Sequence, residues 1–188
     1  ADTFGRIDIL HNCAGGSVIE DKNITDVDME VWDRTIPLDL KGPMLCCRHG
    51  VPYLQAAGGG SIINMSSVSG KVGNAKFAAY CSSKFGVIGF TQSLSREMAE
   101  YKVNVNAICP SLVETERVFG MASALKPDEE TSTEEWRDEM VAQVNSSNPL
   151  GRIAQPKDVA DVAAFLASSQ SDYLTGLAIN VAGGSWMG

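Results

Sequence analysis

The sequence predicts an α/β fold in which a parallel sheet is covered by helices on both faces. The first observation behind this prediction is alternation: short apolar runs of strand length alternate with longer stretches of helical pattern. The second is that small residues or proline follow the apolar runs and end them. This rhythm is typical of βαβ units, whose strands are buried on both faces of the sheet. Right-handed crossovers then place successive strands side by side.

Four apolar runs are the expected strands: residues 7–11, 61–65, 103–108 and 177–181. The first leads into the small-residue turn 12–16, Ser66 and Ser67 close the second, and Pro110 halts the third. Ligands of such sheets bind beyond the carboxyl ends of the strands. We therefore expect the functional site in the loops that follow the first three strands.

Helical patterns fill the intervals between these strands: residues 26–34, 38–57, 78–101 and a helix that begins at Pro156. Proline is favoured at a first helical position, and Asp158 adds an anion to the first turn, where the helix dipole favours it. The segment 116–148 departs from the alternation. Within it, Ser132 and Glu135 have the spacing of a capping box at the start of a further helix.

Composition and charge exclude several classes of protein. A hydrophobic fraction of 44% and a charged fraction of 20% are those of a globular chain, and 188 residues suit a single domain. With 15 Lys+Arg against 23 Asp+Glu, the net charge is −8 and the basic residues are scattered singly, so we expect no nucleic-acid partner. No apolar run reaches the roughly 20 residues of a membrane helix, and no signal peptide opens the chain. We expect a cytoplasmic protein without a membrane partner.

The five cysteines and two histidines do not stand at metal-ligand spacing. We therefore expect reduced, mostly buried thiols and no metal site.

Tyr80 and Lys84 stand four residues apart in a predicted helix, which places them on one face, one turn apart. A lysine in that position can hold a phenol partly ionised. Moving a phenol pKa from about 10 to about 7.5 requires roughly 3.4 kcal/mol. One ammonium at ~4 Å in an effective dielectric of ~20 supplies about 4 kcal/mol. The pair thus predicts a general acid/base that works near neutral pH.

Ser67 lies at the end of an apolar strand, and Gly70 and Gly73 separate it from Tyr80. A hydroxyl there can donate to an oxygen that also receives the proton of Tyr80, which makes two donors for a developing alkoxide. A purely structural alternative stays open, because Ser66 and Ser67 can also cap the following turn. Asn12 can likewise bridge backbone segments instead of taking part in chemistry.

In order and spacing, the chain resembles the short-chain dehydrogenase/reductase family in four motifs: Asn12-x-Ala14-Gly15, Asn64-Met65-Ser66-Ser67, Tyr80-x-x-x-Lys84 and Asn106-Ala107-x-x-Pro110. The resemblance runs from about Ile7 to Gly184. It implies a single domain over residues 1–188 with a Rossmann-like, doubly wound sheet, of which this chain holds the C-terminal four strands. It also implies an oxidoreductase that interconverts a secondary alcohol and a ketone with NAD or NADP, and NAD is the first expectation.

The resemblance also assigns roles to individual residues. Tyr80 is the expected acid/base, Ser67 orients the substrate oxygen, and Lys84 tunes Tyr80 and holds the nicotinamide ribose. The segment 116–148 corresponds to the substrate lid of the family. The residues that the resemblance assigns to the cofactor are Asn12, Ala14, Gly15, Tyr80, Lys84, Pro110, Val113 and Thr115.

The chain departs from the family pattern at a catalytic position. Asp39 stands where the family usually has an asparagine that holds a proton-relaying water. We expect Asp39 to keep a catalytic role, with a changed pH dependence because its charge alters the field at Lys84. Ser111 replaces a glycine and Ala182 replaces a common aspartate, and we expect both to be tolerated.

A second departure concerns the Gly-rich turn that binds the cofactor phosphates in the family. That turn belongs upstream of Asn12, and no equivalent stands elsewhere in the sequence. We therefore expect an amino-terminal portion to precede Ala1 in the complete polypeptide.

The helices 38–57 and 78–101 carry more small and apolar residues than one sheet face needs. In the family these helices pair across a two-fold axis, so we expect a homotetramer or homodimer.

Two alternatives to the oxidoreductase stay open. Asp39 and the missing phosphate turn are compatible with a non-catalytic binding or scaffold protein, and the same tyrosine and lysine serve family epimerases and dehydratases.

Overall fold

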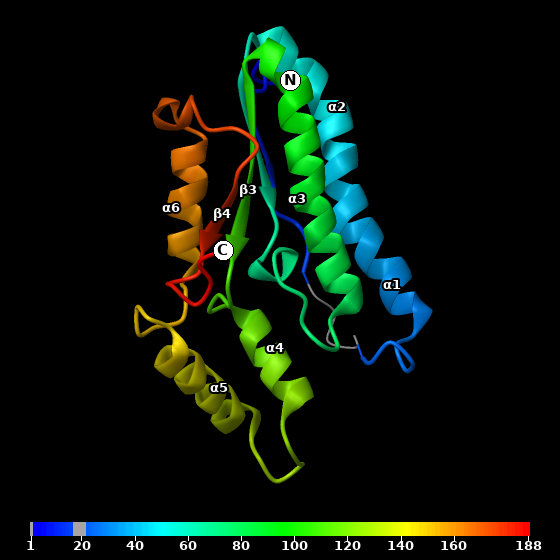
Figure 1. Cartoon of the computed structure of the whole chain (residues 1–188), viewed down its shortest axis with the longest axis vertical. Coiled ribbons are helices and arrows are strands. Elements are labelled where there is room, and N and C mark those ends of the chain that lie inside the picture. The colour runs from blue at the N-terminus through cyan, green and yellow to red at the C-terminus, as the bar shows by residue number, and fades with distance from the viewer. Residues whose placement is uncertain (1, 17–21) are drawn as a thin grey trace.

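The computed structural model describes residues 2–16 and 22–188, which form a parallel sheet with helices packed on both faces (Figure 1). The strands are β1 (Ile9–Asn12), β2 (Gly60–Met65), β3 (Val103–Pro110) and β4 (Ala178–Val181), and they lie in the sheet in that order. The α-helices are α1 (Met29–Ile36), α2 (Gly42–Ala57), α3 (Ala78–Met98), α4 (Glu116–Leu125), α5 (Thr133–Ser147) and α6 (Pro156–Leu166). Short helical turns are η1 (Pro37–Lys41), η2 (Val68–Gly70), η3 (Ala99–Tyr101) and η4 (Ser169–Ser171). The predicted α/β, Rossmann-like fold is confirmed.

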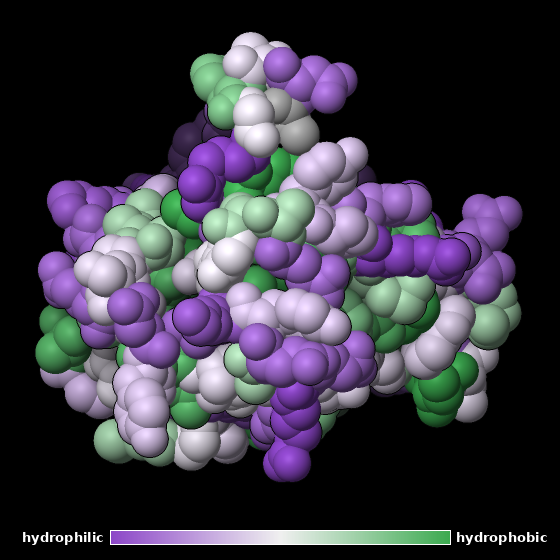
Figure 2. Space-filling model, turned by 90° about the horizontal axis from the view of Figure 1, so that it is seen from above, coloured by the Kyte–Doolittle hydropathy of each residue, from purple (hydrophilic) through white to green (hydrophobic). Residues whose placement is uncertain are grey.

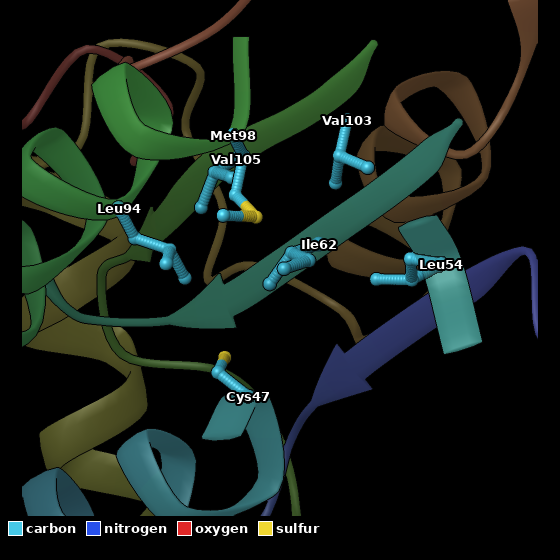
Figure 3. Close-up of a cluster of buried hydrophobic side chains, with 7 residues drawn as sticks. All are labelled: Cys47, Leu54, Ile62, Leu94, Met98, Val103 and Val105. Carbon is cyan, nitrogen blue, oxygen red and sulfur yellow. The ribbon is translucent and has the colours of Figure 1, made fainter. Parts of the chain in front are cut away.

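Successive side chains of β2 point to opposite faces of the sheet, and each face has its own core. Ile62 lies in a buried cluster with Leu54 of α2 and Leu94 of α3 (Figure 3). Its neighbour Ile63 faces the other way and lies in a cluster with Leu166 of α6. Helices α2 and α3 therefore cover one face and α6 covers the other, as expected of a doubly wound sheet.

The third strand ends differently from the prediction. Pro110, expected to halt the strand, is its last residue and pairs with Val181 of β4. On the opposite side β2 has already ended, because its last pair joins Met65 to Ile108. The strand therefore tolerates a residue without an N–H group at this position.

Helices α3 and α6 begin at Ala78 and Pro156 as predicted, whereas the first two helices begin at other residues. The predicted helix 38–57 begins as the π-helical turn η1, and α2 follows it from Gly42. The expected helix 26–34 is α1, shifted to 29–36 and capped by the side chain of Asp28. The capping box predicted at Ser132 is present at the start of α5.

The segment 116–148 folds into α4 and α5, which lie beyond the carboxyl ends of β3 and β4 (Figure 1). An ion pair between Arg137 of α5 and Glu114 ties this segment to the loop after β3. Val113 of the same loop forms a parallel bridge with Ala154. These contacts tie α5 and the segment before α6 to the loop after β3, one of the loops in which the sequence predicts the site.

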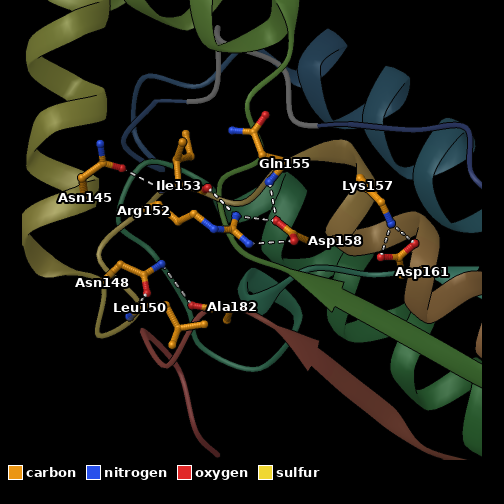
Figure 4. A network of polar contacts seen from close by, with 10 residues as sticks. All are labelled: Asn145, Asn148, Leu150, Arg152, Ile153, Gln155, Lys157, Asp158, Asp161 and Ala182. Carbon is orange, nitrogen blue, oxygen red and sulfur yellow. Dashed lines mark hydrogen bonds and ion pairs between the residues drawn. The ribbon is translucent and has the colours of Figure 1, made fainter.

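A polar network joins the end of α5 to the start of α6 and to the loop after β4 (Figure 4). Asn148 accepts from the backbone N–H of Leu150 at 3.1 Å and donates to the carbonyl of Ala182 at 3.4 Å. Arg152 pairs with Asp158, which also accepts from the N–H of Gln155 at 2.7 Å. The C-terminal end of α5 is thereby anchored to the loop after β4.

The end of the molecule away from α4 and α5 is covered mainly by hydrophilic side chains, with apolar ones scattered among them (Figure 2). None of the helices in the described part of the chain combines the length and apolarity that crossing a bilayer requires.

Candidate active site

A cavity of about 360 Å³ opens at the carboxyl ends of the strands. Its wall is formed by the loop after β1, the end of β2 with η2, the first turns of α3, the loop after β3 and the start of α4. This is the edge of the sheet at which parallel α/β folds bind ligands. The cavity therefore lies where the sequence predicts the functional site.

Tyr80 and Lys84 reach the cavity from consecutive turns of α3. The Lys84 ammonium lies 5.6 Å from the centre of the Tyr80 ring and donates a hydrogen bond to the carbonyl of Met65 at 3.1 Å. Only 4% of the Lys84 side chain is exposed, so the ammonium acts in a largely dry setting.

Ser67 enters the same cavity from the end of β2, where its side chain accepts from the Ser69 N–H at 3.1 Å and caps η2. Its hydroxyl also hydrogen-bonds the Tyr80 phenol and lies 3.5 Å from the carbonyl oxygen of Pro110. The capping alternative is thus confirmed for Ser67, while its role toward a substrate oxygen stays a prediction. Ser67, Tyr80 and Lys84 converge on one space, which is the geometry that two donors to one substrate oxygen need.

Asp39 lies behind Lys84 and is fully buried on η1. Its carboxylate is 3.7 Å from the Lys84 ammonium, and it accepts from the Gly16 N–H at 2.7 Å and from the Ser83 hydroxyl at 3.3 Å. A side chain at Gly15 would put its Cβ 2.5 Å from this carboxylate, so glycine is needed there. Asp39 therefore joins the loop after β1 to α3 by hydrogen bonds. It pairs with the Lys84 ammonium without itself lining the cavity.

The electrostatics of the site correct the sequence argument about Tyr80. Burial raises the pKa of Tyr80 above the ordinary value of a phenol, the hydrogen bond from Ser67 opposes that rise, and the Asp39 charge adds to it. Burial also lowers the pKa of Lys84, while the Asp39 carboxylate raises it. The predicted depression of the Tyr80 pKa is wrong for this chain, because desolvation dominates and a buried carboxylate sits beside the ammonium.

The residues assigned to the cofactor divide into two groups. Gly15, Pro110, Val113 and Thr115 line the cavity together with Tyr80 and Lys84. Asn12 and Ala14 are not among the described residues that line it.

Asn12 instead belongs to a buried polar chain. Its amide donates to Asn64 Oδ1 at 2.8 Å, and the Asn64 amide donates to Thr91 Oγ1 at 3.0 Å. Asn12 therefore has a structural place between β1 and β2, but it is linked there through side chains and not, as the structural alternative had expected, through the backbone.

Sequence reasoning missed the residues that α4 contributes. Arg117, Val118 and Met121 line the cavity from the first two turns of this helix. Their spacing of one and four residues puts them on one side of a helix that begins after Thr115. A helix predicted from Glu116 onward would have placed them together on one face.

Comparisons with known proteins show which sequences and folds this chain is similar to. Residues 1–185 match the protein-family model described as enoyl-(acyl carrier protein) reductase. The mouse protein (3R)-3-hydroxyacyl-CoA dehydrogenase is 38% identical over 180 residues, which cover 95% of this chain and 63% of the relative. The chain thus spans less than two thirds of the length of that relative.

Two solved structures are similar throughout the chain. A short-chain type dehydrogenase/reductase from Mycobacterium ulcerans has a TM-score of 0.83 at 32% identity, and the match covers 98% of this chain and 62% of that one. The structure described as ElxO with NADP bound has a TM-score of 0.84 at 27% identity, over 98% of this chain and 69% of that one.

Proposed function

This chain belongs to the short-chain dehydrogenase/reductase family, and on that premise we propose that it interconverts a secondary alcohol and a ketone with a nicotinamide dinucleotide. The observation that carries the proposal is the convergence of Ser67, Tyr80 and Lys84 on one cavity at the carboxyl edge of the sheet. The mouse relative, named as a hydroxyacyl-CoA dehydrogenase, supports the reaction class. The substrate is a small molecule that carries the alcohol or carbonyl group.

The residues around the cavity fit the nicotinamide half of such a cofactor. Lys84 and Tyr80 would hold ribose hydroxyls, and Thr115 with the backbone of Val113 would hold the nicotinamide end. Gly15 lines the cavity, and its lack of a side chain leaves room for the Asp39 carboxylate behind Lys84. Asn12 would hold the strand beneath this loop in place, and the nicotinamide ring, when bound, gives or takes the hydride.

The choice between NAD and NADP rests on other observations. The expectation of NAD finds no support in the comparisons, because the similar ElxO structure holds NADP. We propose NAD or NADP as cofactor. Titration with NADH and with NADPH, measured by nicotinamide fluorescence, gives the two dissociation constants that decide the preference.

The protein groups then perform the proton chemistry. Ser67 and Tyr80 both donate to the substrate oxygen, which fixes the carbonyl between them. In ketone reduction Tyr80 gives its proton to that oxygen as negative charge develops there, and in alcohol oxidation the phenolate takes the proton back. Because burial raises the Tyr80 pKa, the phenol is protonated at neutral pH, which is the state that reduction requires.

We propose that α4 and α5 together form the substrate lid expected for residues 116–148. The support is that Val118 and Met121 of α4 line the cavity.

We also propose a homotetramer or homodimer, supported by an apolar groove between α2 and α3. The expected cytoplasmic location stays a prediction that cell fractionation with an antibody to the chain tests.

Tyr80→Phe tests the proposed function. It removes the proton donor and keeps the ring, so we expect the rate of ketone reduction to fall about a thousand-fold. The measurement is nicotinamide oxidation at 340 nm with a panel of ketones, and nucleotide binding should change little. Tyr101→Phe, on the exposed turn η3, is the control and should keep full activity. Retained activity in Tyr80→Phe overturns the mechanism.

A further inference from the structure

The charged side chains that line the cavity, among the residues that the structure describes, are both cations: Lys84 and Arg117. The protein as a whole carries a net charge of −8. A molecule with that surplus repels anions at long range. The charged side chains that line the described wall therefore have the opposite sign to the net charge of the protein, and the Asp39 carboxylate lies buried 3.7 Å from the Lys84 ammonium.

Arg117 lies at the open part of the cavity, in the first turn of α4. Its guanidinium packs over Gly16, where a Cβ would lie 2.9 Å from Nη1. The absence of a side chain at Gly16 is what lets the guanidinium approach the loop after β1. From there its charge reaches the reacting groups. It opposes the rise in the Tyr80 pKa and adds to the fall in the Lys84 pKa.

Next to this cation the same helix presents apolar surface. Met121 lines the cavity one turn further along α4, on the same side as Arg117, and is only half-buried, whereas Val118 beside it is almost fully buried. Phe77, just before α3, adds an aromatic ring to the wall. A ligand that fills this space meets a guanidinium and an apolar wall together.

From this arrangement we propose that the substrate carries an anionic group, a carboxylate or a phosphate, on an apolar skeleton, and that Arg117 binds this group. The planar guanidinium matches two oxygens of a carboxylate or phosphate at once. The apolar skeleton packs against Met121 and Phe77 while the carbonyl meets Ser67 and Tyr80. Arg117 is then the residue that determines specificity in the proposed oxidoreductase site, on which this inference rests.

Binding of two matched probes tests the inference without requiring turnover. Hexanoate and hexanamide share a skeleton and differ in charge, and calorimetric titration of the full-length protein with saturating NADP⁺ compares them. We expect hexanoate to bind at least tenfold more tightly than hexanamide. In Arg117→Gln the two should bind equally, while Arg96→Gln, on the exposed outer face of α3, should keep the preference. Butyl phosphate in the same titrations ranks phosphate against carboxylate.

Three outcomes overturn the inference. The first is equal binding of hexanoate and hexanamide to the unmodified protein, and the second is no binding of either anion at millimolar concentration. The third is an Arg117→Gln variant that loses affinity for NADP⁺ and keeps the preference for hexanoate, because Arg117 then serves the cofactor phosphates. Failure of the proposed function appears separately, as retained turnover in Tyr80→Phe.

Discussion

At the scale of single residues, the pairing of Asp39 with Lys84 distinguishes this site. Both side chains are almost fully buried, and the carboxylate accepts from Gly16 and Ser83 while facing the ammonium. A buried carboxylate without its partners would be costly, so each group depends on the other. The consequence for chemistry is that the Asp39 charge adds to the rise in the Tyr80 pKa.

Asp39→Asn should shift the pH dependence of alcohol oxidation. Oxidation needs the Tyr80 phenolate, so its rate rises with pH through the Tyr80 pKa. The Asp39 charge raises that pKa, and its removal lowers it. We therefore expect the rising limb of the pH–rate profile to move to lower pH in Asp39→Asn. Loss of the buried pair should also destabilise the fold by roughly 3 kcal/mol, measured by urea unfolding.

Asp161→Asn is the matched control, because Asp161 pairs with Lys157 on an exposed face of α6. It should change neither the profile nor the stability measurably. An unshifted profile in Asp39→Asn means that position 39 takes no part in setting proton transfer.

At the scale of elements, a chain of buried amides holds the strands to α3. Asn12 donates to Asn64, which donates to Thr91 on the helix. These hydrogen bonds set the position of α3 relative to β2, and the same helix carries Tyr80 and Lys84. It thus connects a motif that sequence reasoning assigned to the cofactor with the placement of the catalytic side chains.

Thr91→Val should destabilise the protein by about 1–3 kcal/mol, because it leaves the buried Asn64 amide without its acceptor. Thr35→Val on α1 is an unusually close control: Thr35 is also 1% exposed, but its hydroxyl has no hydrogen-bond partner among the described residues. That substitution should be neutral or stabilising. Equal losses in the two variants, measured by thermal unfolding, would contradict this role of the amide chain.

At the scale of the whole molecule, the groove between α2 and α3 is the surface that we expect to be covered by a second copy. Met44, Val51 and Phe90 line it, and Met44 is 39% exposed in the single chain. An apolar groove between two long helices is typical of a surface that self-association buries.

Met44→Glu places a charge in this groove and should reduce the mass measured by light scattering from that of an oligomer to that of one chain. Leu125→Glu, on an exposed position of α4, is the control and should keep the oligomeric mass. A single-chain mass for the unmodified full-length protein contradicts the proposed assembly.

The sequence by itself determined the features that local periodicity and spacing control. Alternation of apolar runs and helical patterns gave the parallel sheet, and a four-residue interval put Tyr80 and Lys84 on one helix face. The strand end at Ser67 put its hydroxyl at the carboxyl edge. Each of these depends on residues near one another in the chain, so no tertiary information is needed.

Only the tertiary structure decided how these groups are charged and what surrounds them. The raised pKa of Tyr80 follows from burial by segments distant in sequence, which spacing along α3 cannot report. Asp39 meets Gly16 across 23 positions, and Arg117 reaches the same loop from α4. Desolvation and the sum of several charges are properties of the assembled interior, and they arise only when the chain is folded.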